Sequence, residues 1–206
     1  MAHRDETATA GRTGSWLTGQ PVTKLQRFFT RLRFVLAVVG AAVIVAFTDR
    51  GPMWPGVLVA LAGEFVQIWS SAHLHKNVRI AKSGPYAWVR NPMYVGRFLV
   101  GMGFVVLTWR WFLMAPYVVG FWAYAHARVL GEEARLRERF GDEYAEYRRT
   151  VRRWIPLPPR RPLSKARWSW AAVRRNHQLR VSAGVIAALA ALKVRLEVWG
   201  SVLLRG

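Results

Sequence analysis

Long apolar runs separated by short polar or basic segments constrain this chain more than any other feature. Four runs cover residues 34–47, 54–72, 94–109 and 111–130, and a fifth covers residues 181–204. Because about 20 apolar residues cross a bilayer as a helix, the runs predict four to five transmembrane helices. Only Arg110 separates the third and fourth runs, which predicts a tight antiparallel pair. We therefore expect an all-α fold, organised as a polytopic membrane helix bundle.

The composition narrows the class of protein further. The formal net charge is +20, while 52% of the residues are hydrophobic. Such basicity suits nucleic acid or an anionic membrane surface. The charge is segregated from the apolar runs, which disfavours a soluble DNA-binding domain and a nucleic-acid partner. The chain has no cysteine, which excludes a disulfide scaffold, a Cys-ligated zinc site and a cysteine nucleophile.

The basic residues also predict an orientation. With four spans, the N-terminal segment, the loop 73–93 and the segment 131–180 share one side and hold 6, 4 and 14 Lys and Arg residues, 24 in all. The opposite side holds Arg50 and Arg110, and Arg205 joins them if the last run crosses. Cytoplasmic loops of membrane proteins carry the excess of Lys and Arg. The N-terminus and the active site are therefore expected on the cytoplasmic side.

The chain divides into three predicted parts: a flexible basic tail at 1–33, a membrane core at 34–157, and a basic linker with a membrane-associated helix at 158–206. The charge pattern changes at Gly131. From there, apolar residues recur at spacings of 4, 4, 3 and 4, which is one face of a helix. They are Leu136, Phe140, Tyr144, Tyr147 and Val151. We therefore expect a cytoplasmic amphipathic helix over residues 131–153.

Two polar blocks carry the candidate chemistry. The first is a loop between the turns Gly84-Pro85 and Asn91-Pro92, which holds two aromatic rings and Arg90. The second is Arg128, Glu132 and Glu133, at the cytoplasmic end of the fourth run. Arginine holds a carboxylate in a forked geometry, glutamate holds an ammonium group, and aromatic faces cover a flat base or attract a cation. S-adenosylmethionine carries all of the matching ligand groups: a carboxylate, an ammonium group, a flat purine base and a sulfonium cation. The alternative is an interfacial loop and an ordinary exposed ion pair.

The two blocks resemble a known family. Residues 84–96 read Gly-Pro-Tyr-x-x-Val-Arg-Asn-Pro-Met-Tyr-x-Gly. Residues 128–147 read Arg-x-x-x-Glu-Glu-x-x-Leu-x-x-x-Phe-Gly-x-x-Tyr-x-x-Tyr, and Arg153-Trp154-Ile155-Pro156 follows. Over about residues 34–157 the chain resembles the isoprenylcysteine carboxyl methyltransferase and phospholipid methyltransferase superfamily of integral membrane methyltransferases.

This resemblance implies a membrane methyltransferase that uses S-adenosylmethionine, with membrane lipids as partners and a lipid-like or amphipathic acceptor. The methylated group is left open among carboxylate, amine and thiol. Asn91 stands where many members carry His, so an imidazole base is not expected there. The implied cofactor-binding residues are Tyr86, Val89, Arg90, Asn91, Pro92 and Tyr94 on the loop, and Arg128, Glu132 and Glu133 on the helix.

The catalytic candidates are Arg128, Glu64 and His126, and we predict no metal site. Glu64 and Gln67 lie three apart in the second run. A carboxylate within a bilayer is costly and faces a cavity or a partner. It therefore lines the acceptor cavity or contacts the cofactor, or else forms an interhelical hydrogen bond or pairs with Arg97. His126 either faces the pocket or has no catalytic role.

Two other functions compete with methyl transfer. The first is an NADPH-dependent membrane reductase of the sterol type, which shares a related Arg-x-Pro-x-Tyr-x-Gly segment, here residues 90–96. The second is a non-catalytic lipid-binding membrane scaffold. The pair Glu132-Glu133 and the Phe140-Gly141-x-x-Tyr144 spacing favour methyl transfer.

Overall fold

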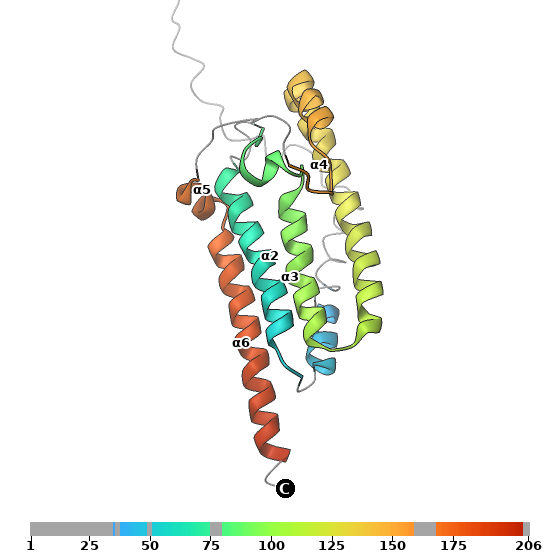
Figure 1. The fold of residues 1–206 in the computed structure, drawn as a ribbon, viewed down its shortest axis with the longest axis vertical. Helices are drawn as coiled ribbons and strands as arrows, with labels where there is room; N and C mark the ends of the chain where they lie inside the picture. Colours follow the sequence, from blue (N-terminus) through green and yellow to red (C-terminus); the bar gives the residue numbers. More distant parts are fainter. Residues whose placement is uncertain (1–34, 36–37, 49–50, 75–79, 159–167, 204–206) are drawn as a thin grey trace, which may run out of the picture. The chain divides into compact units, whose positions relative to one another are not determined.

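The computed structural model describes residues 35, 38–48, 51–74, 80–158 and 168–203 (Figure 1). The predicted tail at 1–33 and most of the predicted linker lie outside these residues. The chain forms two compact units, Met1–Val43 and Ile44–Gly206. In the first unit, the described residues 35 and 38–43 are helical. The helices and the site described below belong to the second unit.

Helices α2 (Trp54–His73) and α3 (Pro92–Leu107) pack closely along a seam of glycines. A Cβ on Gly63 would lie 2.7 Å from the carbonyl oxygen of Gly96, and one on Gly103 would lie 2.6 Å from that of Gly56. Side chains are essentially never found this close to backbone. Small residues allow such close approach in membrane helix pairs. The seam fixes the register of α2 against α3.

The expected antiparallel pair of the third and fourth runs is present. Helix α3 ends at Leu107, and a tight connection with Trp109 at φ 54° leads through the 3-10 turn η2 (Trp111–Leu113) into α4 (Met114–Thr150). The hydroxyl of Tyr117 donates a hydrogen bond to the carbonyl of Phe98, 2.9 Å away. Their rings also stack, with centroids 5.6 Å apart. This contact ties α4 to α3.

Helix α4 differs from the expected boundary between a span and a separate amphipathic helix. It continues through Gly131, and its non-helical residue is Gly141, at φ 47° and ψ −122°. The charge pattern changes at residue 131, but a change of composition does not break a backbone, whereas a glycine at positive φ does. The predicted apolar face is confirmed, because Tyr144, Tyr147 and Val151 form one buried cluster against Leu136 and Phe140.

Two further helices follow residue 158, α5 (Trp170–Arg175) and α6 (Gln178–Leu203). The short helix α5 lies in the segment that we expected to be a linker. The hydroxyl of Ser169 caps it by accepting a hydrogen bond from the Ala172 amide, 3.2 Å away. Helix α6 runs antiparallel to α2 and lies beside it (Figure 1).

A buried polar cluster joins α2 to α6. The carboxylate of Glu64 accepts hydrogen bonds from Gln67 at 3.0 Å, from Gln178 at 3.4 Å and from the Ser182 hydroxyl. Glu64 therefore forms the interhelical hydrogen bond that was one of its predicted alternatives. It does not pair with Arg97, which is exposed and lies over the ring of Tyr94.

Every regular element of the described residues is helical, which confirms the all-α prediction. No helix among those residues combines the length and the hydropathy that a bilayer crossing requires. The polytopic arrangement therefore stays a prediction.

Candidate functional site

Residues 83–91 form a loop, which we call the aromatic loop. Its first residues pack against the end of α2. Gly84 has φ 57°, and a Cβ there would lie 2.7 Å from the imidazole of His73. Both conditions require glycine at this position. The 3-10 turn η1 (Gly84–Ala87) follows, and Pro92 then starts α3 at a position suited to proline. The two predicted turns are thus both present.

A second segment, residues 151–157, returns from the end of α4 to the aromatic loop. We call it the return segment. The amide of Arg90 donates to the carbonyl of Arg152 at 2.8 Å, and the amide of Leu157 donates to that of Trp88 at 3.1 Å. The side-chain amide of Asn91 reaches the carbonyl of Arg153 at 3.4 Å. The loop and the return segment therefore form one backbone-linked layer.

The carboxylate of Glu133 on α4 binds two guanidinium groups from this layer. Arg153 donates from Nε to Oε1 at 3.1 Å and from Nη2 to Oε2 at 2.8 Å. Nη2 of Arg90 lies 3.5 Å from Oε1 of the same carboxylate. The side chains of Glu133 and Arg90 are only 8% and 10% exposed. This cluster brings the two polar blocks of the sequence together.

The cluster retains one positive charge, because two guanidinium groups share one carboxylate. It also holds two buried donors without a protein acceptor, Nε of Arg90 and Nε1 of Trp154. The indole of Trp154 packs edge-on against the ring of Tyr94, with centroids 6.4 Å apart. Buried donors are normally satisfied. A ligand with an anionic group and hydrogen-bond acceptors, such as S-adenosylmethionine, is suited to these residues.

Most of the predicted site residues lie together. Tyr86, Val89, Pro92 and Tyr94 are buried, and Arg90, Asn91 and Glu133 make the contacts given above. Arg128 and Glu132 are exposed on α4, and neither forms an ion pair among the described residues. His126 stacks on Trp122, at 5.0 Å between centroids, and its Nδ1 is buried without a partner. Glu64 lies apart from the others, in the α2–α6 cluster.

A group of buried tyrosines supports the aromatic loop. The hydroxyl of Tyr147 donates to the carbonyl of Tyr86 at 2.7 Å. Burial raises the pKa of Tyr144 to about 12, and the nearby Glu133 carboxylate adds to the rise. Burial also raises the pKa of Tyr86 and Tyr147. Hydrogen bonding to Glu133 raises the pKa of Arg153 in turn. These phenols therefore stay neutral, and Arg153 stays charged, throughout the physiological range.

Sequence reasoning missed two residues of this arrangement, Arg153 and Trp154. Both belong to the string Arg153-Trp154-Ile155-Pro156, which we noted only as the end of the family pattern. The signal that could have identified Arg153 is the pair of acidic residues at 132 and 133. A carboxylate has two oxygens, so a glutamate that already faces Arg90 can also bind a second arginine in a forked geometry.

The chain is similar to known methyltransferases over the region that contains the two polar blocks. A model of the phospholipid methyltransferase family matches residues 55–143. Relatives named protein-S-isoprenylcysteine O-methyltransferase are 35% identical over 85 residues in Schizosaccharomyces pombe, 35% over 78 in Homo sapiens and 27% over 114 in Saccharomyces cerevisiae. These alignments cover 41%, 38% and 50% of this chain, and 36%, 28% and 48% of the relatives. No solved structure matches the chain.

These matches confirm the predicted resemblance to the isoprenylcysteine carboxyl methyltransferase and phospholipid methyltransferase superfamily. The chain spans less than half the length of each of the three relatives. The region that the family model matches contains the aromatic loop and Glu133, whereas the return segment and helices α5 and α6 lie beyond it.

Proposed function

We propose that this chain is an integral membrane methyltransferase that uses S-adenosylmethionine and acts on a lipid-like or amphipathic acceptor. One observation carries the proposal: the aromatic loop and the Glu132-Glu133 block meet at a buried cluster with surplus positive charge and orphaned donors. The names of the relatives favour methyl transfer over the reductase and the scaffold.

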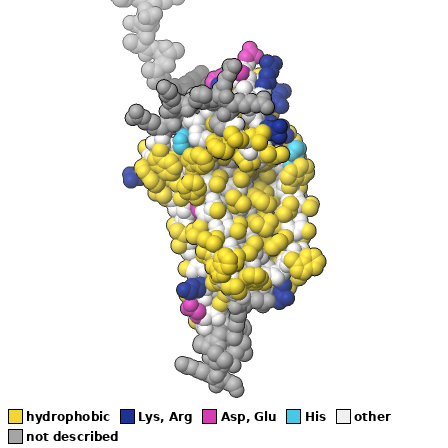
Figure 2. Space-filling view, in the orientation of Figure 1, with side chains coloured by type: hydrophobic (Ala, Val, Ile, Leu, Met, Phe, Trp, Pro, Cys, Tyr) yellow, Lys and Arg dark blue, Asp and Glu magenta, His cyan; other side chains and the backbone are white. Residues whose placement is uncertain are grey.

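The membrane location is supported by what the helices expose. Polar residues lie inside, as the Glu64 cluster does, while large apolar side chains face outward. Exposed apolar patches of this extent mark interaction with a membrane or another protein. Figure 2 shows apolar side chains across the middle of one face. Those more than half exposed on α2, α4 and α6 include Leu58, Phe65, Val119, Trp122, Ile186 and Val194.

The positive-inside rule supports a cytoplasmic position for the site. The aromatic loop, the return segment and the second half of α4 carry eight of the 17 arginines and lysines of the described residues, whereas the turn between α3 and α4 carries only Arg110. In the four-span arrangement that we propose, these segments lie at the inner leaflet, and the Arg110 turn lies on the opposite side. The same proposal includes the first run, residues 34–47, as a membrane span, and residues 158–206 as a basic linker with a membrane-associated helix.

The site residues have distinct proposed roles. S-adenosylmethionine, when bound, supplies an already activated methyl group. Arg90 and Trp154 offer N–H donors to its carboxylate or base nitrogens, and Glu132, which is exposed, offers a carboxylate to its ammonium group. Glu133 is committed to two arginines and positions them. The apolar Val89 and Tyr94 exclude water beside them.

The chain then has to align the acceptor and exclude water, which are the main requirements when the donor is already reactive. A carboxylate or thiolate acceptor needs no general base, whereas an amine must first lose a proton. Arg128 and His126 remain candidates for contact with the acceptor, because both lie on α4 about one to two turns before Glu133. Glu64 is the weakest candidate, since Gln67 on α2 occupies its Oε1 and two residues of α6 occupy its Oε2.

Ligand titration on the full chain in detergent tests the cofactor. We expect S-adenosylmethionine to bind and NADPH not to bind. Glu132→Ala and Arg90→Ala should each weaken binding roughly 10- to 150-fold, the range of a charged hydrogen bond. Glu138→Ala, an exposed glutamate on the same helix, is the matched control and should change nothing. Binding of NADPH alone would overturn the proposal.

A methyl-transfer screen with radiolabelled S-adenosylmethionine tests the acceptor. The substrates are membrane lipid extracts and prenylated peptides, with water-soluble amines and thiols as controls. Label should enter a product that organic solvent extracts, and Arg90→Ala should reduce that incorporation at an S-adenosylmethionine concentration below saturation. Incorporation only into the soluble controls would reject the lipid-like acceptor.

A further inference from the structure

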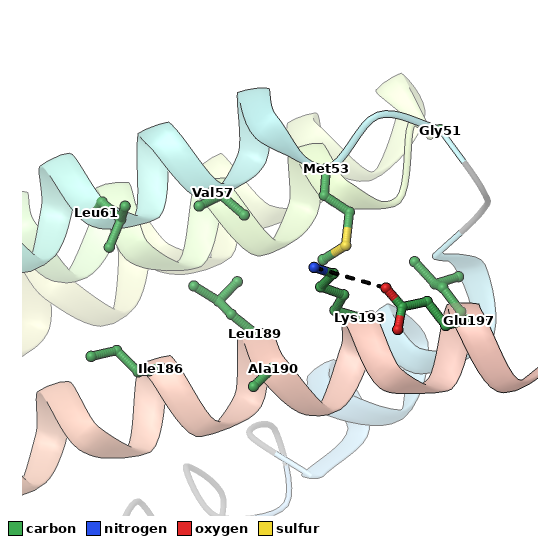
Figure 3. Close-up of a pocket in the computed structure, with 10 residues that line it drawn as sticks. Gly51, Met53, Val57, Leu61, Ile186, Leu189, Ala190, Lys193 and Glu197 are labelled. Atoms are coloured by element: carbon green, nitrogen blue, oxygen red, sulfur yellow. Dashed lines mark ion pairs between the residues drawn. The ribbon is translucent and has the colours of Figure 1, made fainter.

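A cleft separates α2 from α6 at the end of α2 that is distant from the aromatic loop. Its volume is about 710 Å³, and it opens to the outside. Figure 3 shows Val57 and Leu61 on α2 facing Ile186 and Leu189 on α6. Its lining is apolar except at one end, where Lys193 and Glu197 lie.

The cleft is separate from the methyl-transfer site. Val57 is 16 residues before His73, where the aromatic loop meets α2, which is about 24 Å along a helix. Between the two, Glu64 and Ser182 hydrogen-bond across α2 and α6. The cleft therefore ends at this buried polar cluster and does not continue toward Arg90 and Glu133.

The charged end of the cleft carries both signs of charge. Nζ of Lys193 lies 3.8 Å from Oε1 of Glu197, and both side chains are 67% exposed. An exposed pair spaced i, i+4 contributes only about 0.3–0.5 kcal/mol. Either group can therefore turn to a ligand at little cost, so a ligand with one anionic and one cationic group matches the pair.

The position of this end within the helices identifies the type of ligand. Lys193 lies beside Met53, at the turn that leads into α2 (Figure 3). In the proposed membrane orientation, this turn lies at the bilayer boundary opposite the active site. The apolar part of the cleft then lies at the depth of the acyl chains, and the charges lie at the depth of the headgroups.

We infer that the cleft binds one diacyl phospholipid with a zwitterionic headgroup. Lys193 contacts the phosphate, Glu197 contacts the ammonium group, and one acyl chain lies between α2 and α6. A phospholipid with a net negative headgroup lacks the cation that Glu197 attracts. The inference rests on the membrane location in the proposed function and not on methyl transfer.

Native mass spectrometry of the full chain in detergent tests this inference. Phosphatidylethanolamine and phosphatidylglycerol with identical acyl chains are titrated separately, and the first bound lipid is quantified. We expect phosphatidylethanolamine to bind more tightly by roughly two- to fivefold, the range for one exposed charge pair. Glu197→Gln should remove this preference, and Lys193→Gln should weaken the binding of both lipids.

Blocking variants test the location. Ala190→Trp fills the cleft and should abolish the first binding event, and Leu61→Trp should do the same from the α2 side. Val194→Trp is the control, because Val194 is 57% exposed on the same helix but outside the lining. Unchanged binding in both blocking variants would overturn the inference, as would equal affinity of the wild-type chain for the two lipids.

The same variants separate this inference from the proposed function. Ala190→Trp should still bind S-adenosylmethionine, because its site lies beyond the Glu64 cluster. If the wild-type chain binds lipid as expected but no S-adenosylmethionine, only the methyltransferase proposal fails. If it binds S-adenosylmethionine but lipid binding ignores the blocking variants, only the lipid site fails.

Discussion

The guanidinium of Arg153 donates two hydrogen bonds to the carboxylate of Glu133, at 3.1 and 2.8 Å, across 20 residues of sequence. This forked contact connects the return segment to α4, and the backbone bonds of Arg90 and Leu157 then connect the return segment to the aromatic loop. The stability of the site and its affinity for a ligand should therefore depend on different glutamates.

Glu133→Ala should destabilise the fold, because it leaves two arginines without their shared carboxylate. The loss of a partner from a buried ion pair costs about 3 kcal/mol. Glu132→Ala removes an exposed side chain and should change the free energy of unfolding by less than about 0.5 kcal/mol. Denaturant titration in detergent measures both. Equal effects of the two substitutions would contradict the assigned difference.

Glycines in the α2–α3 seam and a glycine outside it should respond to alanine with opposite changes in stability. Gly63→Ala and Gly103→Ala place a methyl group against backbone of the neighbouring helix and should destabilise by about 1–3 kcal/mol. Gly120→Ala meets no atom within 4 Å in α4 and should stabilise by roughly 0.5–1 kcal/mol through helix propensity. Thermal unfolding followed by circular dichroism distinguishes the two signs.

The tyrosine cluster predicts an alkaline limit to stability. The folded-state pKa of Tyr144 is about 12, above its ordinary value of 10.0, so the folded protein holds this proton more tightly than the unfolded chain does. Its contribution is complete below pH 10.0 and is lost as the pH rises toward about 12. The melting temperature should fall over this interval. The decline should be shallower in Tyr144→Phe, and an equally steep decline would contradict the assignment.

The Glu64 cluster should control the attachment of α6. Ser182→Val removes a donor from a buried carboxylate, which costs about 1–3 kcal/mol. Limited proteolysis should then release the α6 region sooner, while α2 and α3 remain intact through their glycine seam. The matched control is Ala183→Val, because Ala183 is the next residue along α6 and is exposed. This control should leave the cleavage rate unchanged, and equal acceleration in both variants would argue against a role for the Ser182 hydroxyl.

The helices were predictable because long apolar runs and a 3.6-residue period are local signals. The turn at Arg110 and the buried face with Tyr144 and Tyr147 followed from them. The choice between Glu132 and Glu133 was not predictable, since adjacent residues differ by about 100° around a helix. The bond between Glu64 and Ser182 joins residues 118 apart, and only the packing of α6 on α2 decides it.

The glycine seam between α2 and α3 also limits how a ligand could enter the site. With backbone against backbone at Gly56, Gly63, Gly96 and Gly103, the two helices have no room to slide past each other. They form a rigid frame, and the aromatic loop is anchored to it at the end of α2 and at the start of α3. A ligand that enters the site would therefore have to displace the return segment beyond Gly141, which hydrogen bonds to the aromatic loop and to the Glu133 carboxylate hold in place.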